Sequence, residues 1–401
     1  MKVYEVGTGY TPIPAKMGAA TEIVVEELTK AFIKKNIDVS VVDIAAKERL
    51  KTDLPIVEVK IPKCFMRTDI QLGIMHKMKR VVYSVSLSLV LKKMLVLSEE
   101  NVIIHFHNQY NLFFFLKLVS PQIRKKCFII YTNHSYIWHG KWSEIKDIVK
   151  RRYFQEIVCM KKANKVFVLN KMTENILVNH LFIPKNKLVL IDNGVNTNTY
   201  FPFSANEIKK LKIKLNLREK RIFLQVGSVC DRKNQLGAIE LLCPVLKKYK
   251  DVLFLYAGGI IDLEYHRKII KFADDNNISD KIKYMGEVEP GKTLNELYNL
   301  AEALIFPSKS EGFSLVIIEA MSAGIPVIIN RTLQFKLANI CYQYKDNVDF
   351  CSIIENEILN AKRHELKSKE LRTTILENYS WDRIADDYCN SWRWDKGGKQ
   401  I

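Results

Sequence analysis

The chain of 401 residues is 48% hydrophobic and 26% charged, which excludes a largely disordered protein and suits two globular domains with separate cores. It contains no apolar stretch of the roughly 20 residues that a membrane-spanning helix needs, and residues 1–6 predict a strand and not a signal peptide. The 62 basic and 44 acidic residues give a net charge of +18, which predicts an anionic partner: a nucleic acid, a membrane surface or a phosphorylated substrate.

The eight cysteines form no C-x-x-C pair and no zinc-finger spacing, and several lie inside apolar runs. This pattern favours reduced core cysteines in a cytoplasmic protein. The aromatic set of an RNA-binding domain and the spacing of a zinc finger are missing as well, so we expect no nucleic acid partner.

The first strand, Lys2 to Val6, leads into a glycine-containing loop and then a helical pattern that runs to about Asn36. The loop lacks G-x-G-x-x-G and the P-loop Gly-Lys-Ser/Thr, so neither a dinucleotide site nor a P-loop is indicated. Gly18 opens the helix and would allow close approach of a diphosphate. The alternative is a glycine that only serves a turn.

A basic segment follows the strands near Val39 to Asp43 and Ile56 to Lys60. Residues 60–97 contain eight Lys or Arg and one acid, Asp69, and mix basic clusters with long apolar runs. That mixture suits a helix lying on anionic lipid. A core helix with a solvated basic end fits equally well.

The next strands, Val102 to His107 and Phe128 to His134, complete an alternation of strands and helices that predicts a parallel, doubly wound sheet. His107 and His134 lie at the ends of successive strands, where open α/β sheets bind ligands. Trp138 follows in a loop and either contacts an acceptor or packs in the core.

A second sheet begins at Arg221 to Gly227 and continues with strands at Val252 to Ala257 and Ile282 to Met285. Between the first of these strands and its helix lie Arg232 and Lys233. A strand that ends in glycine, followed by two cations, suits a phosphate clamp, because Arg binds phosphate oxygens bidentately and Lys binds them as a point charge.

The stretch Ile305–Ile328 predicts a strand, a loop, a helix from about Ser314 to Ala323 and another strand. Glu319 lies in that almost wholly apolar helix and therefore needs a hydrogen-bond partner. Glu311 lies in the loop before the helix, where the helix dipole favours an anion. The alternative is a solvated Glu311 and a Glu319 paired with a lysine.

This stretch closely resembles the donor-site motif of the family-4 retaining glycosyltransferases of GT-B fold: Pro-Ser-x-x-Glu-Gly-Phe, then Glu-Ala-Met-Ser-x-Gly-x-Pro-Val, with seven residues between the two glutamates. The two histidines, the segment after Asn193 and the sequence after Tyr379 also resemble the family. The sequence departs from it in that Gly18-Ala19 stands for a Gly-Gly pair, Ser228 for an arginine and Asn196 for an aspartate.

The resemblance implies an α/β protein with two Rossmann-like, doubly wound domains facing a deep cleft. It implies an acceptor-binding domain at residues 1–198, a nucleotide-sugar-binding domain at 199–378, and a C-terminal helix at 379–401 that crosses back to the first domain.

The resemblance also implies a set of site residues and no metal. The catalytic residues would be His134, Glu311, Arg232 and Lys233. The donor-binding residues would be Gly18, Gly227, Arg232, Lys233, Gly286, Val288, Glu311, Gly312, Phe313, Ser314, Leu315 and Glu319. His107 and Trp138 would lie on the acceptor side.

The implied function is transfer of a sugar from a nucleoside-diphosphate sugar, a co-substrate and not a cofactor, to a cell-surface glycan or a lipid-linked acceptor. With the basic segment, this predicts a cytoplasmic enzyme held peripherally on the anionic inner face of the membrane. The alternatives are a nucleotide-sugar epimerase of the same fold, a glycosidase, and a non-catalytic basic membrane-binding protein.

Overall fold

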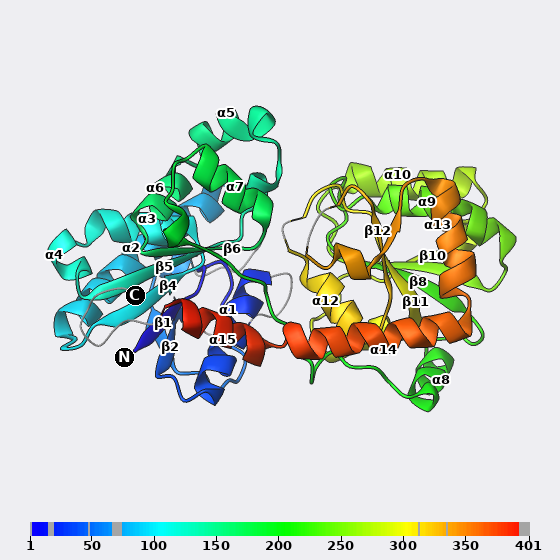
Figure 1. Ribbon diagram of the computed structural model, residues 1–401, viewed down its shortest axis with the longest axis horizontal. Helices are drawn as coiled ribbons and strands as arrows, with labels where there is room; N and C mark the ends of the chain where they lie inside the picture. The colour runs from blue at the N-terminus through cyan, green and yellow to red at the C-terminus, as the bar shows by residue number, and fades with distance from the viewer. Residues whose placement is uncertain are drawn as a thin grey trace. The chain divides into compact units, whose positions relative to one another are not determined.

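The computed structural model describes residues 2–14, 20–46, 49–65, 74–311, 313–333 and 336–392, without the side chains of 136, 139 and 361–364 (Figure 1). Gly18 and Gly312 therefore lie outside the described residues. The chain divides into two compact units: unit 1 is formed by Met1–Asn193 with Trp381–Ile401, and unit 2 by Gly194–Ser380.

Unit 1 is built on a seven-stranded sheet in which all neighbouring strands are parallel, in the order β3-β2-β1-β4-β5-β6-β7. The strands are β1 Val3–Val6, β2 Val39–Ile44, β3 Ile56–Val59, β4 Val102–Phe106, β5 Cys127–Asn133, β6 Lys165–Val168 and β7 Leu188–Leu190. Every residue of β2 and β4 is buried, as expected for strands covered on both faces.

Helices connect these strands in the manner of a doubly wound sheet. They are α1 Ala20–Lys34, α2 Ile74–Leu97, α3 Gln109–Leu118, α4 Pro121–Arg124, α5 Trp142–Arg152, α6 Phe154–Lys162 and α7 Lys171–Asn179, with short 3₁₀ turns at Lys63–Phe65, Tyr136–His139 and Lys185–Lys187. The last helix, α15 Trp381–Ser391, lies beside α1, as Figure 1 shows. Nζ of Lys35, the residue after α1, lies 2.7 Å from Oδ1 of Asp386 in α15.

Unit 2 contains a six-stranded parallel sheet in the order β10-β9-β8-β11-β12-β13. Its strands are β8 Arg221–Val226, β9 Val252–Ala257, β10 Ile282–Tyr284, β11 Ala301–Phe306, β12 Val327–Asn330 and β13 Tyr342–Tyr344. Its helices are α8 Ala205–Lys214, α9 Gln235–Lys248, α10 Leu263–Asp275, α11 Lys292–Leu300, α12 Leu315–Ser322, α13 Asn347–Ile353, a π-helical turn Ile354–Ile358 and α14 Ala361–Asn378, with 3₁₀ turns at Ser279–Lys281 and Ala338–Ile340.

The two parallel sheets confirm the predicted fold class. In both sheets the loops that leave the carboxyl ends of neighbouring strands emerge along one edge, so residues far apart in the sequence meet there. Among the described residues, no helix is long and apolar enough to cross a membrane.

Candidate active site

In unit 2, Arg232, Lys233 and Glu311 form one ion-pair cluster. The two cations lie in the loop between β8 and α9, and Glu311 lies in the loop between β11 and α12. Because β8 and β11 are neighbours in the sheet, these loops are adjacent. The Arg232 guanidinium lies 2.7 Å and the Lys233 Nζ 2.6 Å from the same oxygen, Oε1 of Glu311. The expected alternative of a solvated Glu311 is therefore wrong.

Local contacts fix the position of Lys233. The side-chain amide of Gln225 donates to the Lys233 carbonyl at 2.8 Å. Gly227 lies beside the lysine stem: its φ of +146° is one that other residues rarely adopt, and a Cβ built there would lie 3.4 Å from Cδ and Cε of Lys233. The Nζ lies 5.4 Å above the ring of Phe306. An ammonium group held in this way is ready to meet an anion without reordering a flexible side chain.

Glu319 is buried on α12, and its partner is a tyrosine. The Tyr298 hydroxyl of α11 donates to Glu319 Oε2 at 2.8 Å, so the predicted requirement for a hydrogen-bond partner is confirmed and the lysine alternative is wrong. Burial raises the pKa of Glu319 to about 7, although the hydroxyls of Tyr298 and Tyr200 act to lower it. Any further hydroxyl that donates to this carboxylate would stabilise its charged form and lower its pKa.

The other described donor-site candidates lie in loops at the carboxyl edge of the same sheet or at the start of α12. Gly286 follows β10 with φ +75°, and a Cβ built there would meet nothing within 4 Å. Val288, Phe313 and Leu315 pack partly buried against the core of unit 2. Ser314 is at the N-cap position of α12, although its side chain makes no capping hydrogen bond.

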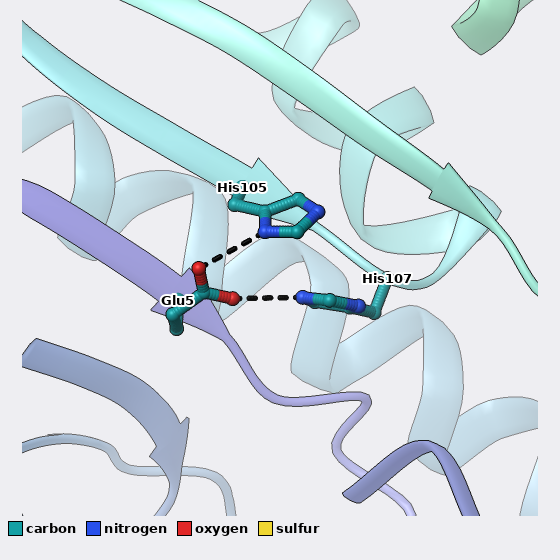
Figure 2. Close-up of side chains that lie close together, drawn as sticks. All are labelled: Glu5, His105 and His107. Atoms are coloured by element: carbon teal, nitrogen blue, oxygen red, sulfur yellow. Dashed lines mark hydrogen bonds and ion pairs between the residues drawn. The ribbon is translucent and has the colours of Figure 1, made fainter. Parts of the chain in front are cut away.

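In unit 1, Glu5 holds two histidines at the carboxyl end of the sheet, as Figure 2 shows. Parallel pairing of β1 and β4 places Glu5 directly opposite His105. Nδ1 of His105 lies 2.9 Å from Glu5 Oε1, and Nε2 of His107 lies 2.8 Å from Oε2. All three side chains are buried.

The cluster continues through His107 to His134. Nδ1 of His107 lies 3.0 Å from Nε2 of His134, and Nε2 of His105 lies 2.7 Å from the hydroxyl of Thr132. Sequence analysis identified His107 and His134 but missed Glu5 and His105. A charged side chain in the middle of the apolar strand Lys2 to Val6 was the available signal, because a buried ion requires a partner.

The protonation of the cluster follows from its hydrogen bonds. Burial alone would raise the pKa of Glu5, but the two histidines lower it to about 2, so the carboxylate accepts from both rings. Burial lowers the pKa of His107 to about 4, and the ring, which donates through Nε2, must accept through Nδ1. His134 then donates through Nε2, and its remaining nitrogen, Nδ1, carries a lone pair.

The same three side chains could hold a metal ion, since their ligand atoms lie within 4.8 Å of one another. Both ring nitrogens of His105 and of His107 have hydrogen-bond partners, and Glu5 accepts from both rings. The hydrogen bonds therefore account for the cluster without an ion.

Next to this cluster lies a cavity of about 380 Å³ within unit 1. Residues from α1, α2, α3, α5, the strand β5 and the loops after β1, β4, β5 and α5 surround it. They are Thr8, Tyr10, Thr21, Arg80, His107, Asn108, Gln109, Tyr110, Tyr131, His134, Ser135, Arg152 and Tyr153. The structure thus brings both predicted histidines to one cavity.

Trp138 belongs to the core and not to this cavity. The side chain is fully buried, and its indole N–H donates to Glu156 Oε2 at 2.9 Å. Glu156 also accepts from Tyr131, Asn133 and Ser135. The expectation that Trp138 contacts an acceptor is therefore wrong, and the packing alternative is correct.

The protonation of His107 makes unit 1 sensitive to acid. A base whose pKa falls from 6.5 in the unfolded chain to about 4 in the folded chain takes up a proton on unfolding. We expect the free energy of unfolding to fall by about 3 kcal/mol at most as the pH decreases from 6.5 to 4. Urea unfolding of the wild type and of His107→Gln measures this. The free energy of unfolding of the variant should decrease less steeply with falling pH between 6.5 and 4. The same pH dependence in both proteins would contradict the assignment.

Two family profiles match the chain. The profile described as Glycosyltransferase Family 4 matches residues 21–199, and the profile described as Glycosyl transferases group 1 matches residues 207–336. The first match lies within unit 1 except for its last residues, and the second lies within unit 2.

Among known proteins, an uncharacterised glycosyltransferase of Methanocaldococcus jannaschii is 22% identical over 260 residues, which are 62% of this chain and 64% of that protein. The alpha-galactosylglucosyldiacylglycerol synthase of Streptococcus pneumoniae is 27% identical over 208 residues, 48% of this chain and 50% of that protein. The matches thus span between half and two thirds of these two relatives.

Among solved structures, HepE of Anabaena in complex with UDP and glucose is similar with a TM-score of 0.70 and 13% identity, covering 98% of this chain and 99% of that one. At this level of identity the similarity shows the fold.

Proposed function

Because the chain belongs to the family-4 glycosyltransferases of GT-B fold, we propose that it transfers a sugar from a nucleoside-diphosphate sugar to a hydroxyl group of an acceptor. The observation that best supports this is the convergence of Arg232 and Lys233 on one oxygen of Glu311. Two cations at the carboxyl edge of a parallel sheet match the charge of a diphosphate.

In the proposed reaction, the bond between sugar C1 and the β-phosphate oxygen breaks, and its electron pair leaves with the diphosphate. Arg232 and Lys233 stabilise the charge that develops on that leaving group. The acceptor oxygen forms the new bond to C1 and gives up its proton to an oxygen of the departing diphosphate. The retaining outcome, in which the new bond forms on the face that the diphosphate leaves, is part of the proposal and follows from the family resemblance.

The other site residues take supporting roles in the proposal. Glu319, already bonded to Tyr298, would accept from the ribose hydroxyls through its second oxygen. Glu311 and the backbone of Phe313 and Ser314 would fix the donor sugar. His134 of unit 1 would accept from a hydroxyl of the acceptor through Nδ1. Since the HepE structure contains UDP, a UDP-sugar is the first donor to test.

Binding of UDP-glucose and other nucleotide sugars tests the donor proposal. A ligand that binds only the folded protein raises the melting temperature by mass action, by an amount equal to about 2.7 kcal/mol at 100 times the dissociation constant. We expect one donor to stabilise the wild type and not Lys233→Ala. No stabilisation by any donor, or equal stabilisation of the variant, would overturn the assignment. Donor turnover without acceptor would point to an epimerase.

We expect activity to survive EDTA, because cations and backbone amides neutralise the diphosphate in the proposed site. The test is initial rate after extensive chelation, with the metal content of the protein measured in parallel. Loss of activity that only Mg²⁺ or Mn²⁺ restores would show that a metal ion takes part. The cluster of Glu5, His105 and His107 would then be the first place to look among the described residues.

The proposed acceptor is lipid-linked or membrane-bound, and α2 supports this. Its inner face, including Tyr83, Leu87 and Leu91, is buried in the core. On its outer face, Ile74 is 77% exposed and Leu89 and Val96 are each 55% exposed, with Met78 and Val81 between them. The exposed Lys77, Lys92 and Lys93 lie on the same helix. An apolar stripe bordered by lysines suits the surface of an anionic bilayer.

Two cations of the basic segment do not belong to this surface. Lys79 is buried and donates to the carbonyl of Tyr10 at 3.0 Å. Arg80 lies 5.0 Å from the rings of both Tyr10 and Tyr110. The sequence did not separate these inward cations from the outward ones.

We expect the protein to co-sediment with phosphatidylglycerol vesicles at low salt and to be released at high salt. The triple variant Lys77→Glu, Lys92→Glu and Lys93→Glu should lose binding by about 100-fold or more, because each basic residue near the surface contributes about 1 kcal/mol. The matched control is the same charge change on exposed lysines of α8, at Lys209, Lys210 and Lys214. Equal loss in both variants would indicate attraction by net charge alone.

A further inference from the structure

The cavity of unit 1 holds a fixed arginine. Arg80, on α2, contacts two aromatic rings, with its guanidinium carbon 5.0 Å from the centroid of Tyr10 and 5.0 Å from that of Tyr110. Tyr10 is held in turn by Asn108, whose amide donates to the tyrosine hydroxyl at 3.1 Å. These two cation–π contacts hold the guanidinium in place, and its N–H groups are the atoms that can donate to a ligand.

The two charged side chains that line the cavity are both positive. Arg80 and Arg152 line it, and no Asp or Glu is among its described lining residues. Neither arginine has an ion-pair partner in the part of the chain that the structure describes. The histidines that line it are neutral, since burial lowers the pKa of His107 to about 4 and that of His134 well below its ordinary value.

The nearby buried carboxylates are occupied by other groups. Glu5 accepts from His105 and His107, and Glu22 accepts from the hydroxyl of Thr8. Glu156 accepts from the four donors described above. Among the described residues, none of these three carboxylates forms an ion pair with Arg80 or Arg152.

Two buried polar atoms at the cavity have no hydrogen-bond partner among the described residues: Nε of Arg80, a donor, and Oε1 of Gln109, an acceptor. Nδ1 of His134 is a third polar atom there, with a lone pair. Buried polar groups without partners are costly, and a ligand that pairs with them recovers that cost. The cavity thus offers cations for an anion and acceptors for hydroxyl groups.

We propose that this cavity binds an acceptor that carries a phosphate group close to its sugar hydroxyls. Arg80 and Arg152 bind the phosphate, and Gln109 and His134 accept hydrogen bonds from the hydroxyls. Arginine matches phosphate because its fork of N–H groups meets two oxygens at once. This inference rests on the proposed function, since it names the class of acceptor for that transfer. The phosphate belongs either to a lipid headgroup or to a free sugar phosphate.

Calorimetric titration of the full chain saturated with UDP tests the cavity while the donor site is occupied. The probes are inorganic phosphate, glucose 1-phosphate and the uncharged methyl glucoside. We expect glucose 1-phosphate to bind more tightly than the other two probes. Arg152→Gln and Arg80→Gln should each weaken its binding by tenfold or more, and Arg151→Gln, an exposed neighbour that does not line the cavity, should leave it unchanged.

Arg152 is exposed, so its variant should fold normally, and this keeps the test valid if Arg80→Gln does not fold. Failure of both anions to bind the wild type, or equal binding by Arg152→Gln and wild type, would overturn the proposal. Saturation by UDP, measured first, separates this outcome from failure of the donor assignment.

A second arm identifies the source of the phosphate. Vesicles of zwitterionic phosphatidylcholine that contain a small fraction of anionic phosphatidic acid are titrated against the triple lysine variant of α2 with and without Arg152→Gln. A further loss of binding on changing Arg152 assigns the phosphate to a lipid. No further loss, together with binding of glucose 1-phosphate, assigns it to a free sugar phosphate.

Discussion

Lys233→Ala should lower kcat/KM by on the order of 10²- to 10³-fold, the usual cost of removing one group that stabilises charge in a transition state. The Nζ of Lys233 lies 2.6 Å from Oε1 of Glu311, and the lysine stem lies beside Gly227. The double variant with Arg232→Ala should be less active still, but by less than the product of the two single effects, because both cations act on one carboxylate and one diphosphate.

The matched control is Lys309→Ala. Lys309 belongs to the same loop as Glu311 but pairs with Asp231, at 2.7 Å and 2.8 Å. We expect this variant to keep nearly full activity and all three variants to unfold within a few degrees of the wild type. If the double variant of Arg232 and Lys233 keeps wild-type turnover, the assignment of the phosphate clamp is wrong.

Glu5→Gln should lower activity by about 100-fold, although Glu5 itself touches no substrate in the proposal. A glutamine has one acceptor oxygen and one NH₂ group, so it cannot accept from His105 and His107 together. One ring must change its tautomer. When that ring is His107, its Nδ1 becomes a donor and His134 loses the partner for its Nε2 proton. A wrong histidine tautomer is known to cost enzymes several powers of ten.

The histidine ¹⁵N chemical shifts separate this positioning role from a structural one. Wild type should show His107 with its proton on Nε2 and His134 with its proton on Nε2. In Glu5→Gln we expect at least one of these tautomers to change while unit 2 still binds UDP normally. Reduced activity with unchanged tautomers would show that Glu5 only supports the fold.

The sequence predicted helices and strands well where residues close by in the chain mark their ends. The strand, loop and helix around Glu311 were correct because Pro307, Gly324 and Pro326 mark the ends of those elements in the sequence itself. The two histidines were found for a related reason, since each follows an apolar strand that the alternation of elements places in one sheet.

Partners that come from distant elements were not predictable in this way. Tyr298 lies 21 residues before Glu319, and only the packing of α11 on α12 shows that it is the partner. For Trp138 the sequence allowed either contact with an acceptor or packing in the core, and only the structure shows its buried indole donating to Glu156. Lys79 and Lys77 are two residues apart on α2, and the helical turn alone directs one inward and the other to solvent.

The return of α15 to unit 1 has a consequence for biosynthesis. Tyr388 of α15 is fully buried and its ring lies 5.4 Å from that of His105, so the histidine cluster is closed by residues translated almost two hundred positions after Asn193. Unit 2, which is continuous in sequence, can complete its core on the ribosome first. Unit 1 must wait, partly folded, for α15 to emerge, and in that interval its exposed apolar surface needs protection from aggregation.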